Sequence, residues 1–113
     1  MLKVVLFVFL SMLSVSFCYG KGSISAKKIS RVAFQTGGFF LYAEGGSWNS
    51  PGECSNSDAI VLLSSDSNYD KAYSLLLAAY MSGKAISAYS DGCTTFDGKT
   101  YSTIRGFKYL VVH

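Results

Sequence analysis

The alternation of apolar and polar residues in the first half of the domain predicts a β-hairpin. Residues 29–35 alternate with a period of two, with Val32 and Phe34 on one side and more polar neighbours on the other, which is typical of a half-buried strand. Residues 36–38 read Thr-Gly-Gly, a turn signal because glycine adopts positive φ without steric cost. Residues 39–44 are aromatic and β-prone, so they are predicted as the return strand.

A polar segment and a continuous apolar run follow the hairpin. Residues 45–58 are rich in Gly, Ser and Asn and contain the only proline, so they are predicted as a surface loop. Residues 59–63 are all apolar, which indicates a strand buried on both faces. Residues 64–68 form a second polar break.

Residues 69–82 carry the one helical pattern of the chain. Its apolar stripe consists of Tyr69, Tyr73, Leu76 and Tyr80, broadened by Leu77 and Met81. Ser67 stands at a capping position with Asp70 three residues later. Gly83 stands where a C-terminal stop is expected. A buried stripe predicts that Leu76 lies in the core.

The end of the chain predicts two further strands. Residues 85–90 form one, residues 91–102 form a loop with two glycines, and residues 103–112 form the last strand. The order is then three strands, a helix and two strands. This order predicts a mainly β fold with one helix, a five-stranded barrel of the OB type plugged by the helix. The alternative is an open α+β sheet with the helix packed on it.

The first twenty residues have the composition of a signal peptide. Lys3 precedes an apolar run from residue 4 to residue 10, and small residues follow near Gly20. We expect cleavage after Gly20, with a cut after Ser16 and a bacterial lipoprotein anchored at Cys18 as alternatives. The run is shorter than the roughly 20 apolar residues that span a bilayer. Residues 21–113 are therefore predicted as a single exported domain, secreted or periplasmic, without a membrane span.

Charge adds little to this picture. The chain has ten Lys or Arg and seven Asp or Glu. Without Lys3 the exported domain keeps nine against seven, a net charge of +2. A basic group near its start, Lys21, Lys27, Lys28 and Arg31, is more typical of a solvated terminus than of a binding surface. No nucleic-acid partner is expected from so balanced a charge.

Cysteine usage predicts one disulfide. Cys54 and Cys93 are the cysteines of the exported domain, and two cysteines in an exported chain most simply pair with each other. The loop they close has about 40 residues, which the chain-entropy model equates with about 4 kcal/mol of stabilisation.

Catalytic and cofactor motifs are not found in the sequence. The only histidine is the last residue, His113, and there is no Cys-x-x-Cys spacing, so neither a zinc site nor a serine–histidine centre is predicted. The loop carboxylates, Glu44, Glu53, Asp58, Asp91 and Asp97, have no spacing that pairs them. We therefore predict a protein without enzymatic activity, cofactor or metal.

Aromatic residues are the remaining candidates for function. Eight were considered: Phe39, Phe40, Tyr42, Trp48, Tyr89, Tyr101, Phe107 and Tyr109. Most of them are expected in the core, whereas Trp48 lies in a polar loop and is predicted to be exposed. Trp48, Tyr42 and Tyr89 are predicted to stack on a ligand, and Asn49 and Asp91 to hydrogen bond sugar hydroxyls. The strand 39–44 is a further candidate, for pairing between subunits at a sheet edge.

The second half of the chain resembles a known group of proteins. The helix from Ala72 to Lys84, with its Ser-Gly-Lys end, is followed by a strand, by Asp91-Gly92-Cys93 and by a β-rich end. This pattern, over residues 59–113, resembles small exported bacterial OB-fold proteins and, more distantly, the cell-binding B subunit of subtilase cytotoxin and of related pentameric toxins.

The resemblance implies an OB-fold, a ring-shaped homo-oligomer and recognition of host glycans. It implies no site residue. The expectation is a non-enzymatic module that binds glycans or a host surface. The alternative is a periplasmic protein-interaction or inhibitor protein without a small ligand.

Overall fold

The computed structural model describes residues 21–105 and 109–113. The signal-peptide prediction, its cleavage sites and Cys18 concern residues 1–20 and lie outside the described residues. Within the described part, no helix is long and apolar enough to cross a membrane.

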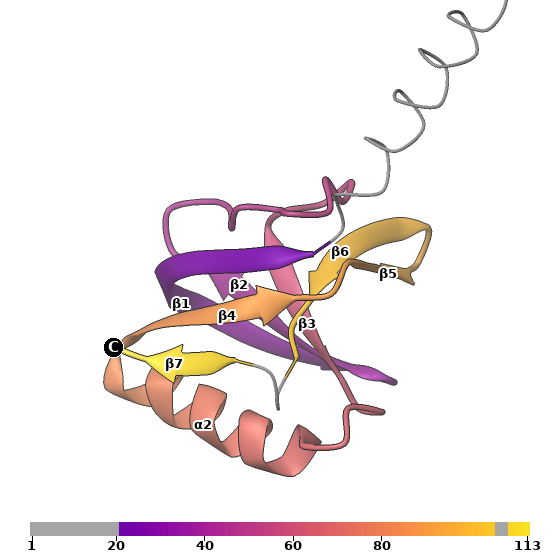
Figure 1. Cartoon of the computed structure of the whole chain (residues 1–113). Helices are drawn as coiled ribbons and strands as arrows, with labels where there is room; N and C mark the ends of the chain where they lie inside the picture. The colour runs from indigo at the N-terminus through magenta and orange to yellow at the C-terminus, as the bar shows by residue number, and fades with distance from the viewer. Residues whose placement is uncertain (1–20, 106–108) are drawn as a thin grey trace, which may run out of the picture.

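Seven strands and one helix make up the described fold (Figure 1). They are β1 (Gly22–Gln35), β2 (Gly38–Ala43), β3 (Ala59–Leu63), α2 (Tyr69–Ser82), β4 (Ala85–Ser90), β5 (Cys93–Phe96), β6 (Lys99–Thr103) and β7 (Leu110–Val112). The strands form one mixed sheet in the order β5-β6-β3-β2-β1-β4-β7. The β3–β6 pair is parallel and the other pairs are antiparallel.

The predicted class, mainly β with one helix, is confirmed, but the closed five-stranded barrel is wrong. The sheet is open, with β5 and β7 at its two ends. Two predictions fail together here, because residues 91–102 form most of a β5–β6 hairpin, and in the described part of residues 103–112 only β7 is a strand of its own. Between β6 and β7, Ile104 N donates to Val61 O and Arg105 N donates to Tyr89 O, so the chain crosses from β3 to β4.

Strand β1 is long because it serves two partners in turn. Its first part pairs with β4 and its second part with β2. The register shifts between Ile24 and Lys27, and again between Ile29 and Arg31. Such irregularities bend a strand and increase its twist. The strand starts at Gly22, seven residues before the predicted start at Ile29.

Strand β2 lies inside the sheet, between β1 and β3. The prediction that residues 39–44 form an edge for subunit pairing is therefore wrong. Both sides of β2 are occupied by backbone partners within the same chain.

The main core lies between the sheet and α2, which runs below the sheet in Figure 1. Its fully buried large side chains include Ile24, Leu41, Ile60, Leu62, Leu76 and Ile86. Leu76 is fully buried as predicted, whereas Met81 is 78% exposed and does not extend the buried stripe. A buried leucine of this kind contributes about 1.5–3 kcal/mol from apolar burial.

Helix α2 has the predicted bounds and the predicted stop. Gly83 has φ 68°, a left-handed conformation that glycine adopts without cost. Gly83 N and Lys84 N donate to Tyr80 O and Ala79 O, which satisfies two terminal carbonyls. The predicted N-cap is one residue off, since Asn68 and not Ser67 is the N-cap, without a side-chain capping bond.

The predicted disulfide between Cys54 and Cys93 is confirmed, with a Cα–Cα distance of 5.7 Å. It joins the loop between β2 and β3 to the first residue of β5. The covalent link therefore fixes the edge hairpin to a loop that is 39 residues away in sequence.

Candidate ligand-binding face

A second, aromatic cluster lies on the sheet face that points away from α2. Successive strand residues point to opposite faces, so Phe40 faces away from the core that contains Phe39 and Leu41. Phe40, Ala59 and Val61 form the buried centre of this second cluster. We call this side of β1, β2, β3 and β6 the outer face.

The β5–β6 hairpin supplies the cover of the outer face. The ring of Phe40 packs edge-on against Phe96, with centroids 5.0 Å apart, and against Tyr101, with centroids 5.3 Å apart. Phe96 and Tyr101 contact each other at 6.5 Å. Such edge-to-face pairs add about 0.5–1.5 kcal/mol each beyond the burial of apolar area. Phe96 and Tyr101 remain half-buried, so part of each ring faces solvent.

Gly38 makes room for this packing. A Cβ atom at Gly38 would lie 2.8 Å from Val61 Cγ1 and 2.9 Å from Phe96 Cζ. The first residue of β2 therefore has no side chain, because the ring of Phe96 and the methyl of Val61 occupy the space that it would need.

Polar contacts hold the hairpin in place near its turn. Asp97 and Gly98 of the turn adopt positive φ, and Gln35 Nε2 donates to Asp97 Oδ2 at 3.0 Å. In the second register pair from the turn, Ser55 N donates to Thr100 Oγ1 at 2.7 Å and Thr100 N donates to Ser55 Oγ at 2.9 Å. Together with the disulfide, these bonds set the position of Phe96 and Tyr101 over the sheet.

Tyr42 and Arg31 extend the aromatic cluster toward solvent. Tyr42 is half-buried on β2, and its register partner Arg31 lies on β1. The Arg31 guanidinium lies over the Tyr42 ring, 4.1 Å from its centroid, as a cation–π contact. In the described part of the chain Arg31 has no ion pair, so its N–H groups face solvent.

The surroundings of Tyr101 raise its pKa above the usual value. Burial is the largest cause, because it disfavours the charged phenolate. Tyr42, Asp97 and Asp58 add to the upward shift by placing negative charge nearby. The Tyr101 hydroxyl is therefore protonated, a hydrogen-bond donor, across the physiological pH range.

The structure contradicts the prediction that Trp48 is an exposed stacking surface. Its side chain is only 3% exposed and belongs to the main core. Trp48 Nε1 donates to Leu41 O at 2.9 Å, and Trp48 N donates to Ser57 O at 2.9 Å. The polar loop folds back onto the sheet, and the indole is its apolar anchor.

Asn49 is exposed, but both ends of its amide are used within the chain. Its Oδ1 accepts from Ser25 N at 2.7 Å and its Nδ2 donates to Ser23 O at 2.8 Å. The amide thus bonds β1 as a neighbouring strand would. These two bonds use one of the two lone pairs on Oδ1 and one of the two N–H groups on Nδ2, and they hold the amide against β1.

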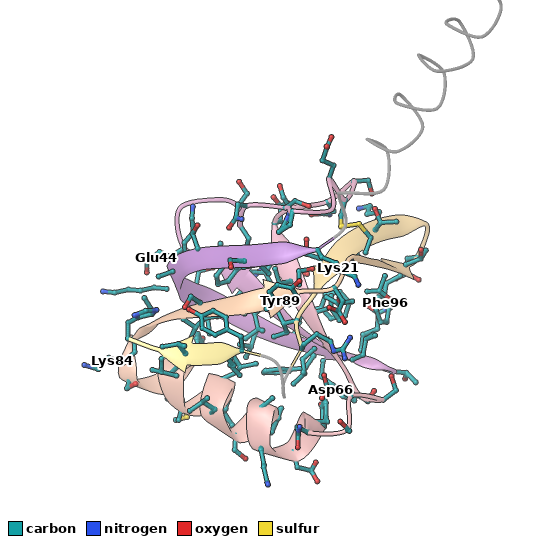
Figure 2. All side chains as sticks on the ribbon, in the orientation of Figure 1. Lys21, Glu44, Asp66, Lys84, Tyr89 and Phe96 are labelled. Carbon is teal, nitrogen blue, oxygen red and sulfur yellow. A yellow bond between two sulfur atoms is a disulfide. The ribbon has the colours of Figure 1, made fainter. Side chains whose placement is uncertain are left out.

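Tyr89 and Asp91 lie away from the outer face. Tyr89 is half-buried on β4 opposite Ser23, and Asp91 forms an ion pair with Arg105. Figure 2 shows Tyr89 on β4 at a distance from Phe96 on the hairpin. Asn49 and Tyr89 meet β1 at the same residue, Ser23, whereas Tyr42 lies at Arg31. The five predicted residues do not form one site.

Phe96 and Arg31 belong to the outer face although the prediction of site residues did not include them. The two glycines and the cysteine of residues 91–102 predict a loop, which hides the two strands of the hairpin. The dipeptide Asp97-Gly98 between threonine-rich segments is a hairpin signal, and it would have placed Phe96 and Tyr101 on one face of two paired strands.

A serine, a tyrosine and the histidine of the chain meet on β4 and at the C-terminal end, outside the aromatic cluster. Ser87 Oγ lies 2.9 Å from His113 Nε2 and 3.5 Å from the Tyr109 hydroxyl. Among the described residues, no carboxylate hydrogen bonds His113. Three or more metal-ligating side chains do not meet anywhere in the described ranges 21–105 and 109–113.

Two shallow hollows lie near the N-terminal end of α2. One, of about 320 Å³, is lined by residues 64 and 66–71. The other, of about 330 Å³, is lined by Leu63, residues 65–67, Ile104 and Arg105. Leu63 also packs against the aromatic cluster, but no aromatic ring of that cluster and no predicted ligand-binding residue lines either hollow.

Comparisons with known proteins give no relative. No family model, no curated protein and no solved structure matches this chain.

Proposed function

We propose that this chain is an exported, non-enzymatic binding module that binds carbohydrate on its outer face. The observation that carries the proposal is the grouping of partly exposed Tyr42, Phe96 and Tyr101 rings on one face. Aromatic rings present an apolar surface that fits the C–H face of a sugar, and the tyrosines add a hydroxyl at the ring edge.

Polar groups around these rings support a sugar ligand over a purely apolar one. The Arg31 guanidinium supplies donors beside Tyr42. Asp58 and Asp97 lie close enough to act on the Tyr101 hydroxyl, and their carboxylates are acceptors. Rings flanked by both donors and acceptors suit a ligand that carries hydroxyls around an apolar face.

The proposed location is the periplasm or the outside of the cell. Structural disulfides persist in oxidising compartments and are rare in the cytosol. The Cys54–Cys93 disulfide agrees with such a compartment, and so does the apolar start of the sequence.

The finer proposal is a receptor-binding subunit of the toxin type, related to OB-fold proteins. In its support, β1 pairs with both β2 and β4, the helix follows β3, and β6 pairs in parallel with β3. This connectivity resembles an OB barrel in which an inserted hairpin has opened the sheet.

A glycan array probed with the purified exported protein tests the carbohydrate proposal. Tyr42→Ala and Tyr101→Ala should each weaken binding to any glycan hit by about tenfold or more, the loss of roughly 1.4 kcal/mol of stacking. Tyr89→Ala is the matched control, a half-buried tyrosine on β4 away from the outer face. No glycan hit with folded protein, or equal losses for all three variants, contradicts the proposal.

The second candidate is a protein-interaction or inhibitor function without a small ligand. Phe34 is 70% and Met81 78% exposed, and aromatic residues and methionine are enriched in protein interfaces. This candidate predicts that one exported partner protein copurifies with the chain, and that Tyr42→Ala leaves that complex intact.

A further inference from the structure

The second part of β1 has one unpaired edge. Pairing of β1 with β4 ends at Lys28, and residues 31–35 pair with β2 only. Among the described residues, no other strand and no backbone hydrogen bond joins residues 31–35 on the opposite side. A free strand edge is a template for another strand.

The hairpin turn determines which backbone groups face this edge. Gln35 pairs with Gly38 across a two-residue turn, and the closing pair of such a turn is hydrogen bonded. Hydrogen-bonded and non-bonded pairs alternate along an antiparallel ladder. Arg31, Ala33 and Gln35 therefore bond β2, while the N–H and C=O groups of Val32 and Phe34 point to the free edge.

Apart from Arg31 at its start, this edge has none of the usual protection against strand addition. Proteins protect edges with lysines, prolines or inward-pointing charges. From Val32 to Gln35 the sequence has neither a charge nor a proline. Phe34 is 70% exposed although it points to the same face as the core residue Phe39.

We propose that two copies of this chain pair through this edge into an antiparallel, two-fold symmetric dimer. The backbone groups of Val32 would bond those of the partner's Phe34, and the reverse. Ala33 would then lie opposite the partner's Ala33 at the symmetry axis. The occupant is a second copy because the edge is complementary to itself on both faces of the sheet.

The face toward α2 supplies the apolar part of that complementarity. Phe34 would pack on the partner's Val32, and aromatic–β-branched pairs across strands contribute favourably to a sheet. The exposed ring of Phe34 would be covered by this contact.

The outer face supplies the charged part. Arg31 would lie opposite the partner's Gln35, and each Gln35 is hydrogen bonded to Asp97 of its own chain. The Arg31 guanidinium would therefore meet the partner's Asp97 carboxylate. Arg31 has no ion pair among the described residues of its own chain, so the dimer supplies the anion.

The symmetry of this contact limits the assembly to two chains. An interface that uses the same surface on both subunits is closed at the dimer. Antiparallel pairing also keeps equivalent faces on the same side of the joined sheet. The two aromatic outer faces would lie side by side, an arrangement that favours multivalent ligands.

Molecular mass in solution tests the dimer. A strand of five residues makes a small interface, so the mass from light scattering should rise from monomer to dimer as concentration increases. Phe34→Lys places a charge in the interface and should raise the dissociation constant at least tenfold. Met81→Lys is the matched control, an equally exposed apolar residue on α2, and should leave the dissociation constant unchanged.

A cysteine pair tests the register. Ala33→Cys would lie about 4.5 Å, Cα to Cα, from its symmetry mate, a distance that a disulfide spans. Mild oxidation should therefore join two chains. Ser30→Cys is the control, because its symmetry mate lies six residues along the strand, about 20 Å away. A mass that stays monomeric, a mass of five chains, or equal cross-linking of both variants overturns the proposal.

Discussion

The two faces of the sheet are both buried, but by different means. The inner face is covered by α2 and packs mainly aliphatic side chains such as Leu41, Leu62 and Leu76. The outer face is covered by an edge hairpin and packs aromatic rings around Phe40. The helix that covers the inner face has 14 residues. The hairpin that covers the outer face is joined to β3 by only two register pairs, both from β6. The outer face therefore depends on side-chain contacts and on the disulfide.

Removal of the disulfide should have the largest effect, because it acts on the weaker cover. Replacing both Cys54 and Cys93 with alanine removes a cross-link with a sequence separation of 39. The chain-entropy model gives a loss of about 4 kcal/mol in the free energy of unfolding. Urea melts of the purified protein measure this loss.

In the variant without the disulfide, the helix and the edge hairpin should also differ in their hydrogen exchange. Hydrogen exchange should rise first in β5 and β6, whose anchors are lost, and later in α2. Uniform exchange across both covers would show that the two faces unfold as one unit.

The inner face should respond most to Leu76→Ala. Leu76 is fully buried among core residues, and a leucine-to-alanine change at such a site costs about 2–5 kcal/mol. Leu75→Ala is the matched control. Leu75 precedes Leu76 on α2 and is 41% exposed, so this change should cost less than about 1 kcal/mol. Equal urea midpoints for the two variants would contradict the helix-covered core.

The inner face was predictable because its signals are local. The apolar periodicity of residues 69–82 and the stop at Gly83 place α2 within one residue. The continuous apolar run at residues 59–63 likewise gives β3 with its bounds. The start of β1 has no apolar periodicity, because Ile24 is its only buried residue before Ile29. Residues 22–28 are a strand because they pair with β4, which the sequence pattern does not indicate.

The outer face was not predictable to the same extent because its contacts are distant in sequence. Gln35 meets Asp97 across 62 residues and Ser55 meets Thr100 across 45. Trp48, which belongs to the main core, is misplaced by the sequence for a different reason, since its partner Leu41 is only seven residues away. Its polar neighbours predict a surface loop, whereas its burial arises only when the loop folds onto β2.

Gly38→Ala tests how tightly the outer face is packed. The added methyl would lie 2.8 Å from Val61 Cγ1 and 2.9 Å from Phe96 Cζ, and overpacking of this kind costs about 1–3 kcal/mol. The same change combined with Phe96→Ala should cost less than the sum of the two single changes. Additive losses in thermal or urea melts would mean that Gly38 and Phe96 are not in contact.

The smallest expected effect is a change in the pKa of two tyrosines, one on each side of the sheet. Burial is the main cause that raises the pKa of Tyr69 on the inner side and of Tyr101 on the outer face. Asp70 adds to the upward shift of Tyr69, and Asp97 adds to that of Tyr101. Asp97→Asn should therefore lower the pKa of Tyr101 and leave that of Tyr69 unchanged, and Asp70→Asn should do the reverse.

The raised pKa values of Tyr69 and Tyr101 determine how the stability of the fold changes with pH. Above pH 10, the unfolded chain loses these phenolic protons before the folded chain does, so the folded state binds more protons and stability falls with rising pH. The stabilisation is complete below pH 10 and is lost as pH passes through each folded pKa. NMR titration of ring-labelled tyrosine measures both values. A shift of both tyrosines by either variant would mean that the carboxylates act through a common field, and that the two faces are not electrostatically separate.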